Sequence, residues 1–240
     1  AAGGVIKNAP EKDFRVDIDE ILARVDARTR IVFIANPANP TGTVISFSEV
    51  KRLHQSLRSD ILLIIDGAYS EFAGGGYAAE LALAGAAPNI LVTKTFSKIF
   101  GLAALRVGWG YAAPNVIAAL DRVRPPFNTT RAGQAAAIAA LRDDAFLKKS
   151  VDYVVAARSD LAGFLEDFGL TVIPSAANFV TALFGAEARM SASEAESALS
   201  RRGVLVRGLK SYGLEYGLRI TIGAPADLER FRSAFCEIMR

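Results

Sequence analysis

The chain has 240 residues, of which 51% are hydrophobic and 22% charged, with a formal net charge of +3. This amount of apolar material suffices for one large domain or two smaller ones. Basic and acidic residues are interspersed, which argues against a nucleic-acid-binding protein, and we expect no membrane association because no apolar stretch is long enough to cross a bilayer. The single cysteine, Cys236, excludes an internal disulfide and a cysteine metal cluster, so we expect a reducing, cytoplasmic setting and no metal.

The first half of the chain alternates short apolar runs with helical patterns. We expect a helix at 17–24 capped by Asp17, strands at 31–35, 61–65, 90–94 and 106–111, a helix from 46 to about 58, a glycine-rich loop at 74–76 and a short helix at 79–84. The run at 31–35 is typical of a parallel strand that is covered on both faces. The alternation predicts an α/β sheet flanked by helices.

The pattern changes after Pro125 and Pro126, with the transition between residues 120 and 145. We expect a large domain at 1–128 and a smaller α+β domain at 129–240. Its predicted helices are 132–141, 144–168, 193–201 and 226–239, and its predicted strands are 170–174, 178–183, 204–207 and 217–222.

The stretch from Thr95 to Arg106 brings reactive side chains together. It contains the hydroxyls of Thr95 and Ser97, the amine of Lys98 and the guanidinium of Arg106, between apolar flanks. A lysine that loses its proton is a nucleophile toward carbonyls, while hydroxyls and an arginine suit a phosphate. By itself, the stretch could equally be a buried strand end from which a lysine reaches solvent.

Other polar residues directly follow predicted strands. Asn39 follows the strand at 31–35, and Asp66 follows the strand at 61–65. Ligands of such sheets bind beyond the carboxyl ends of the strands, so we expect these residues at the same rim as Lys98. The one histidine, His54, falls in a predicted surface helix, and we expect it to have no catalytic role.

Four motifs occur in a fixed order along the chain. They are Asn-Pro-Ala-Asn-Pro-Thr-Gly at 36–42, Asp-Gly-Ala-Tyr at 66–69, Ser97-Lys98 with Arg106, and Leu-Arg-Ile-Thr-Ile-Gly at 218–223. Together they resemble the fold-type I aminotransferases that depend on pyridoxal 5'-phosphate. The resemblance implies an α/β fold of the PLP-dependent transferase type, with a mostly parallel sheet flanked by helices, a smaller α+β C-terminal domain, and a homodimer.

The resemblance also implies a role for each residue around the cofactor ring. Lys98 would form the Schiff base with the cofactor and later move a proton. Asp66 would pair with the pyridine nitrogen, and Asn39 and the hydroxyl of Tyr69 would hydrogen-bond the phenolate oxygen. Read without the resemblance, Asp66 is a turn or cap residue, Asn39 a turn residue and Tyr69 a core residue.

The remaining implied contacts concern the anionic groups. Thr95, Ser97 and Arg106 would hold the cofactor phosphate, although a strand-end threonine also commonly bonds its own backbone. Arg219 would bind the substrate α-carboxylate through two parallel hydrogen bonds, or would be a structural arginine that pairs with a carboxylate.

Further segments, at 126–128, 174–179 and 204–223, resemble the histidinol-phosphate aminotransferase branch. That branch converts histidinol phosphate and 2-oxoglutarate to imidazole acetol phosphate and glutamate in histidine biosynthesis. Asn178 would then orient the α-carboxylate, and Arg207 would bind a substrate anion. Aromatic-amino-acid aminotransferases and a threonine-phosphate decarboxylase share most of these residues, so both reactions stay open, as does a non-catalytic domain.

Members of this family carry a further stretch before the Asn-Pro motif, which supplies additional cofactor contacts. The chain begins Ala-Ala-Gly-Gly. Residues 1–30 are too few to hold that stretch, and we therefore expect a shortened version of the family pattern.

Overall fold

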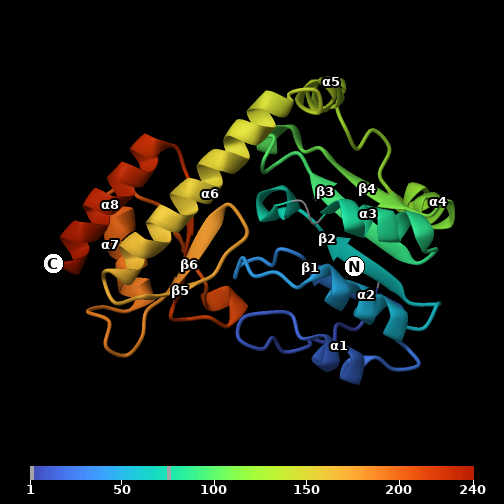
Figure 1. Cartoon of the computed structure of the whole chain (residues 1–240), viewed down its shortest axis with the longest axis horizontal. Helices are drawn as coiled ribbons and strands as arrows, with labels where there is room; N and C mark the ends of the chain where they lie inside the picture. The colour runs from blue at the N-terminus through green and yellow to red at the C-terminus, as the bar shows by residue number, and fades with distance from the viewer. Residues whose placement is uncertain (1–2, 75–76) are drawn as a thin grey trace. The chain divides into compact units, whose positions relative to one another are not determined.

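The computed structural model describes residues 3–74 and 77–240 (Figure 1). The chain forms two compact units, the first made of 1–38 and 44–144 and the second of 39–43 and 145–240. The predicted domains at 1–128 and 129–240 stay predictions. Of the predicted glycine-rich loop, Gly75 and Gly76 lie outside the described residues.

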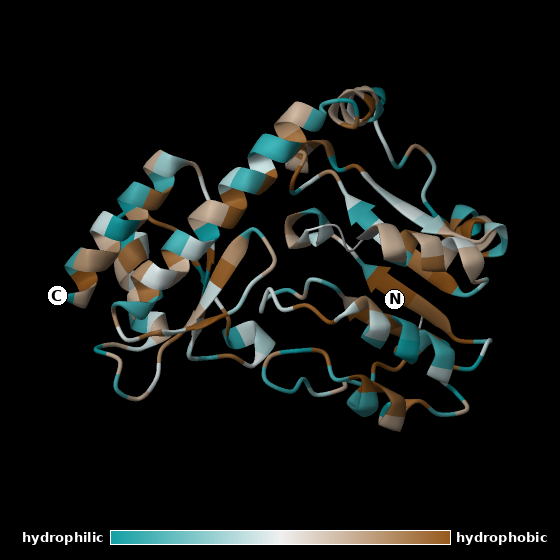
Figure 2. Cartoon of the chain, in the orientation of Figure 1, coloured by the Kyte–Doolittle hydropathy of each residue, from teal (hydrophilic) through white to brown (hydrophobic). Residues whose placement is uncertain are grey.

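The first unit contains a four-stranded sheet in the order β1-β2-β3-β4. The strands are β1 (Ile31–Ala35), β2 (Leu62–Asp66), β3 (Ile90–Thr95) and β4 (Gly108–Ala112). The first three are parallel and β4 is antiparallel to β3, so the predicted mostly parallel sheet is confirmed. The apolar run of β2 stands out in the hydropathy colouring of Figure 2.

Three helices pack on one face of this sheet. They are α1 (Ile18–Arg24), α2 (Phe47–Ser56) and α3 (Tyr77–Ala86). Asp17 caps α1 and a capping box formed by Ser46 and Glu49 opens α2, as predicted. Two further helices, α4 (Pro114–Val123) and α5 (Arg131–Ala140), follow β4. The core under the first three helices contains alternate residues of each parallel strand: Val32, Ile34, Leu63, Ile65, Ile90 and Val92.

The opposite face of β1 is open. Ile31 is 57% exposed and Phe33 61% exposed, and the register places Leu62 and Ile64 of β2 on the same face, both partly exposed. The prediction that 31–35 is covered on both faces was therefore wrong for this structure. A continuous apolar run signals burial on both sides, but the described residues supply helices for only one of them.

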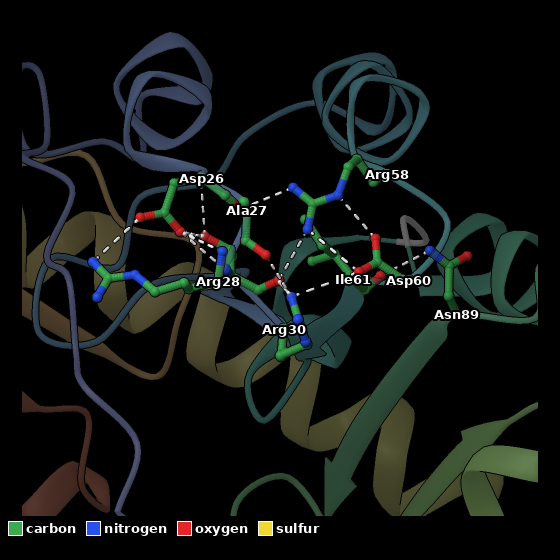
Figure 3. A network of polar contacts seen from close by, with 9 residues as sticks. Asp26, Ala27, Arg28, Arg30, Arg58, Asp60, Ile61 and Asn89 are labelled. Atoms are coloured by element: carbon green, nitrogen blue, oxygen red, sulfur yellow. Dashed lines mark hydrogen bonds and ion pairs between the residues drawn. The ribbon is translucent and has the colours of Figure 1, made fainter.

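Hydrogen bonds and ion pairs connect the residues that lie at the amino ends of the parallel strands (Figure 3). Arg58 donates to the Asp26 carbonyl at 2.8 Å and to an Asp60 carboxylate oxygen at 2.9 Å. Asn89 donates to the carbonyl directly before β2 at 2.8 Å and contacts His54 Nε2 at 3.0 Å. His54 therefore lies at the end of the sheet opposite to the carboxyl ends, in a contact that stabilises the fold.

The second unit has an antiparallel sheet in the order β5-β6-β8-β7. Its elements are α6 (Asp144–Glu166), β5 (Thr171–Ile173), β6 (Phe179–Leu183), α7 (Ala192–Arg201), β7 (Arg207–Gly208), β8 (Gly217–Thr221) and α8 (Pro225–Met239). The strand predicted at 204–207 is shorter and later than expected, because Val204 N–H bonds the Leu199 carbonyl and so completes the end of α7. In the described part of the chain, no helix is long and apolar enough to cross a membrane.

Candidate functional site

Lys98 lies on a closed loop between β3 and β4. Phe96 N–H donates to the Val107 carbonyl at 3.1 Å, and Leu102 N–H donates to the Phe96 carbonyl at 2.9 Å. Phe96 and Ile99 are buried, at 3% and 4% exposure, whereas the Lys98 side chain is exposed. The apolar flanks therefore anchor the loop in the core and present the amine to solvent, rather than enclosing it.

The three predicted phosphate contacts lie together beside this loop. Ser97 N–H donates to Thr95 Oγ1 at 3.0 Å, which is the local backbone contact expected of Thr95 if it does not hold a phosphate. Arg106 Nη1 lies 3.4 Å from Ser97 Oγ. Arg106 Nη1 also donates to the Ala103 carbonyl at 2.9 Å, which holds the guanidinium near the loop. Arg106 adopts φ +52°, a left-handed conformation that is uncommon outside glycine and that occurs at functional turns. Two hydroxyls and a guanidinium thus meet at Ser97, the residue directly before Lys98 in the chain.

Asp66 and Tyr69 come from the turn after β2. Asp66 is the last residue of β2 and pairs in register with Thr93, so it shares a sheet face with Thr95 at the carboxyl end. Its Oδ1 accepts from the Ala68 N–H at 3.0 Å. This is the contact of a turn residue, the role expected of Asp66 without the family resemblance. Tyr69 is 7% exposed, and the Lys98 ammonium lies 5.2 Å from the centre of its ring. The first unit therefore places Tyr69 directly against Lys98.

A buried ion pair lies beneath this turn, and sequence reasoning missed it. Lys94 Nζ contacts Ser70 Oγ and donates to Glu71 Oε1 at 3.0 Å, with side-chain exposures of 1% for Lys94 and 10% for Glu71. The sequence did contain a signal for this pair. Side chains alternate between the two faces of β3, so Lys94 lies on the same face as the buried Ile90 and Val92. A lysine at such a position needs a buried partner.

In the second unit, Asn39 is bound to Arg219. Arg219 Nη1 donates to Asn39 Oδ1 at 2.5 Å, and the guanidinium lies 5.0 Å from the centre of the Phe179 ring. The Asn39 loop is held by Thr181, which is fully buried and donates to the Pro40 carbonyl at 2.6 Å. Because Asn39 belongs to a different compact unit from Asp66 and Lys98, its expected position at their rim stays a prediction.

Arg207 lies directly opposite Arg219 in the pairing of β7 with β8. Two like charges across neighbouring strands repel each other, and an anion bound between them would relieve the repulsion. Arg207 is exposed, as a residue at the end of a short strand is expected to be. Asn178 precedes β6 and is half-buried, and its backbone carbonyl accepts from Ile222 N–H at 2.9 Å. The roles of both side chains stay predictions.

The two units thus present two kinds of chemistry. The first offers a primary amine, an aromatic ring, a carboxylate and a set of phosphate-type donors, and the second offers arginines suited to carboxylate or phosphate. Within residues 3–74 and 77–240, no group of three or more histidine, cysteine, aspartate or glutamate side chains could hold a metal ion.

The sequence matches known proteins along its whole length. The family described as aminotransferase class I and II matches residues 1–235. Histidinol-phosphate aminotransferase 1 of Caulobacter vibrioides is 49% identical over 240 residues, covering 100% of this chain and 66% of the relative. The corresponding enzyme of Rhodospirillum centenum is 45% identical over 235 residues, covering 98% of this chain and 65% of the relative. The chain thus spans a little less than two thirds of the length of these relatives.

Solved structures resemble this fold. The histidinol-phosphate aminotransferase of Sinorhizobium meliloti, in complex with pyridoxal-5'-phosphate, superposes with a TM-score of 0.86 at 30% identity, covering 99% of this chain and 65% of that one. A decarboxylase from Sulfurospirillum multivorans superposes with a TM-score of 0.82 at 26% identity, covering 95% of this chain and 67% of that one.

Proposed function

The chain belongs to the class I and II aminotransferase family, and from that premise we propose that it takes part in pyridoxal-phosphate-dependent transfer of an amino group from histidinol phosphate to 2-oxoglutarate. The observation that carries this proposal is the Lys98 loop. It presents an exposed amine against Tyr69, and its neighbour Ser97 contacts both the Thr95 hydroxyl and the Arg106 guanidinium. A ligand that bears both an aldehyde and a phosphate matches this set of groups. The names of the similar proteins support the choice of substrate.

The donor set of the first unit fits the cofactor. Lys98 would hold its aldehyde carbon, Thr95, Ser97 and Arg106 its phosphate, and Asp66 its ring nitrogen. When bound, the cofactor supplies an electron sink for the substrate α-carbon. Lys98 would carry the proton to and from that carbon, and Tyr69 would donate to the ring oxygen with its hydroxyl.

The side chains of the second unit fit the anionic groups of the substrates. Within the described residues, the buried Arg219 Nε has no hydrogen-bond partner, and Arg219 would donate to the substrate α-carboxylate. Asn39, which Arg219 already binds, would hydrogen-bond the cofactor ring oxygen. Arg207 would bind the phosphate of histidinol phosphate or the distal carboxylate of 2-oxoglutarate, and Asn178 would orient the α-carboxylate.

The test of this proposal is covalent attachment of pyridoxal phosphate. The chain is mixed with the cofactor and reduced with borohydride, and the modified residue is located by mass spectrometry. We expect Lys98 to be modified, Lys98→Ala to abolish the modification, and the exposed control Lys148→Ala to leave it unchanged. Attachment that persists in Lys98→Ala would show that the lysine is wrongly assigned.

A second reaction, decarboxylation of a phosphorylated amino acid, stays open from the sequence motifs, and the Sulfurospirillum multivorans relative is named as a decarboxylase. Product analysis without any 2-oxo acid separates the two, because decarboxylation needs no amino acceptor. We also propose a homodimer, as the family resemblance implies, because two-fold symmetric dimers are the commonest oligomers. Light scattering of the purified protein measures its mass.

A further inference from the structure

Lys94 makes contacts that link two loops carrying proposed cofactor residues. Its side chain leaves β3 one residue before Thr95 and ends among the polar groups of the turn after β2. There its ammonium contacts Ser70 Oγ and donates to Glu71 Oε1 at 3.0 Å. Glu80 of α3 also faces Lys94 and attracts it electrostatically.

The turn closes tightly around the Lys94 side chain. Gly67 N–H donates to the Thr93 carbonyl at 2.9 Å, and Ser70 Oγ donates to the Gly67 carbonyl at 2.7 Å. A Cβ atom added at Gly67 would lie 3.2 Å from Lys94 Cδ, so the lysine stem packs against the backbone of this residue. The stem and the ammonium group together hold the turn from Asp66 to Glu71 against β3.

A buried ion pair holds a turn only at a cost in desolvation free energy. Removing two charges from water costs several kcal/mol, and well-packed apolar residues in such places are often equally or more stable. The pair between Lys94 and Glu71 is therefore poorly explained by stability alone. Its geometry has a clearer use, because Asp66 and Tyr69 lie in the turn that Lys94 holds, while Thr95 and Lys98 follow it along the chain.

We propose that Lys94 is a positioning residue whose buried contacts with Ser70 and Glu71 set Tyr69 and Asp66 against Lys98. This inference rests on the proposed function, since it assigns a purpose to the 5.2 Å approach of the Lys98 ammonium to the Tyr69 ring. Lys94 touches neither cofactor nor substrate in this assignment and acts through the turn.

The first test needs no cofactor. Lysine side chains are methylated with a carbon-13 label, and the Lys98 signal is identified by its absence in Lys98→Ala. The ring current of Tyr69 shifts this signal, and Tyr69→Leu gives its unshifted position. We expect Lys94→Met and Glu71→Gln each to move the Lys98 signal toward the Tyr69→Leu position. The control Asp121→Asn breaks an exposed ion pair with Arg124 and is expected to leave the signal in place.

The second test measures pyridoxal phosphate binding by the same variants. We expect Lys94→Met and Glu71→Gln to weaken binding by about tenfold or more, and the double variant to weaken it no further, because both act through one contact. Lys94→Met leaves the buried Glu71 carboxylate without its partner and is expected to destabilise the chain. Glu71→Gln keeps an acceptor for Lys94 and tests the same contact if Lys94→Met does not fold.

The outcomes separate the two proposals. A Lys98 signal that stays at the wild-type position in both variants overturns the positioning role. If the wild-type chain fails to attach pyridoxal phosphate, the proposed function loses its support, while the signal in the cofactor-free chain still decides whether Lys94 positions Tyr69.

Discussion

At the scale of single residues, Arg219 has two neighbours that hold its guanidinium and one buried donor without a partner among the described residues. Asn39 Oδ1 accepts from it at 2.5 Å and the Phe179 ring lies 5.0 Å from its guanidinium, yet its buried Nε lacks a partner among the described residues. A buried donor without a partner costs about 1–3 kcal/mol. The family resemblance implied that Arg219 binds an anion, but it gave no indication that Asn39 would be its neighbour.

Glu80 is a second buried group in which one polar atom lacks a hydrogen-bond partner among the described residues. It is 4% exposed, Asn36 Nδ2 donates to its Oε1 at 3.0 Å, and its Oε2 has no partner in the described part of the chain. Burial raises the pKa of this carboxyl, while the hydrogen bond from Asn36 and the charge of Lys94 act in the opposite direction. The folded chain therefore binds the Glu80 proton more tightly than the unfolded chain does.

This raised pKa predicts a dependence of stability on pH. Stability from Glu80 is present at low pH and is lost as pH rises above the ordinary value of 4.5 and through the raised value. Glu80→Gln keeps an acceptor for Asn36 but cannot ionise, so its free energy of unfolding should increase relative to wild type as pH rises. Urea unfolding from about pH 4 to about pH 8 measures this difference, with the exposed Glu166→Gln as control. Parallel profiles for the two variants would contradict the expectation.

At the scale of elements, the loop that carries Lys98 depends on one backbone conformation. Gly101 adopts φ +68°, and its N–H donates to the Lys98 carbonyl at 3.0 Å. A Cβ atom at Gly101 would meet nothing within 4 Å, so space does not dictate glycine there. Its positive backbone angle φ alone favours glycine at this position, because residues with a Cβ atom disfavour the left-handed region.

The same substitution should have opposite effects at two glycines. Gly101→Ala is expected to destabilise the chain by about 1 kcal/mol because of its positive φ. Gly163→Ala, inside α6 and also without an atom within 4 Å of the added Cβ, is expected to stabilise it by about 1 kcal/mol. Thermal and urea unfolding give both changes, and an equal effect at the two sites would rule out this account.

At the scale of the whole molecule, one face of the first sheet leaves apolar side chains exposed. Ile31 and Phe33 project from β1, an edge strand, and more than half of each side chain is exposed. Exposed apolar residues on an edge strand favour association between chains. The relatives are about half as long again as this chain, so they carry further sequence that the described residues do not include.

We expect this face to limit the solubility of the chain as it stands. Phe33→Lys should reduce concentration-dependent light scattering without lowering the melting temperature, since the Phe33 side chain makes few contacts to lose. Phe127→Lys is the matched control, because Phe127 is 99% exposed but lies in a loop outside the sheet. Equal scattering from the wild type and Phe33→Lys would show that this face does not drive association.

The sequence by itself determined the order and type of the elements and the motifs that carry the chemistry. The parallel sheet and the Lys98 loop followed from local properties of the sequence. These are the spacing of apolar residues, the capping box at Ser46 and the polar residues that follow the strands. The family resemblance then supplied the roles of Asp66, Tyr69 and Arg219.

Only the tertiary structure decided which side chains are buried and which meet. Lys98 faces solvent while Phe96 and Ile99 are buried, because the loop closes on its own backbone and packs inward through its aromatic residue. The contacts of Lys94 with Glu71 and of Asn39 with Arg219 join residues far apart in sequence, and no local pattern encodes such pairs. Burial on both faces of a strand likewise depends on a second layer of helices, which the strand's own residues can favour but cannot provide.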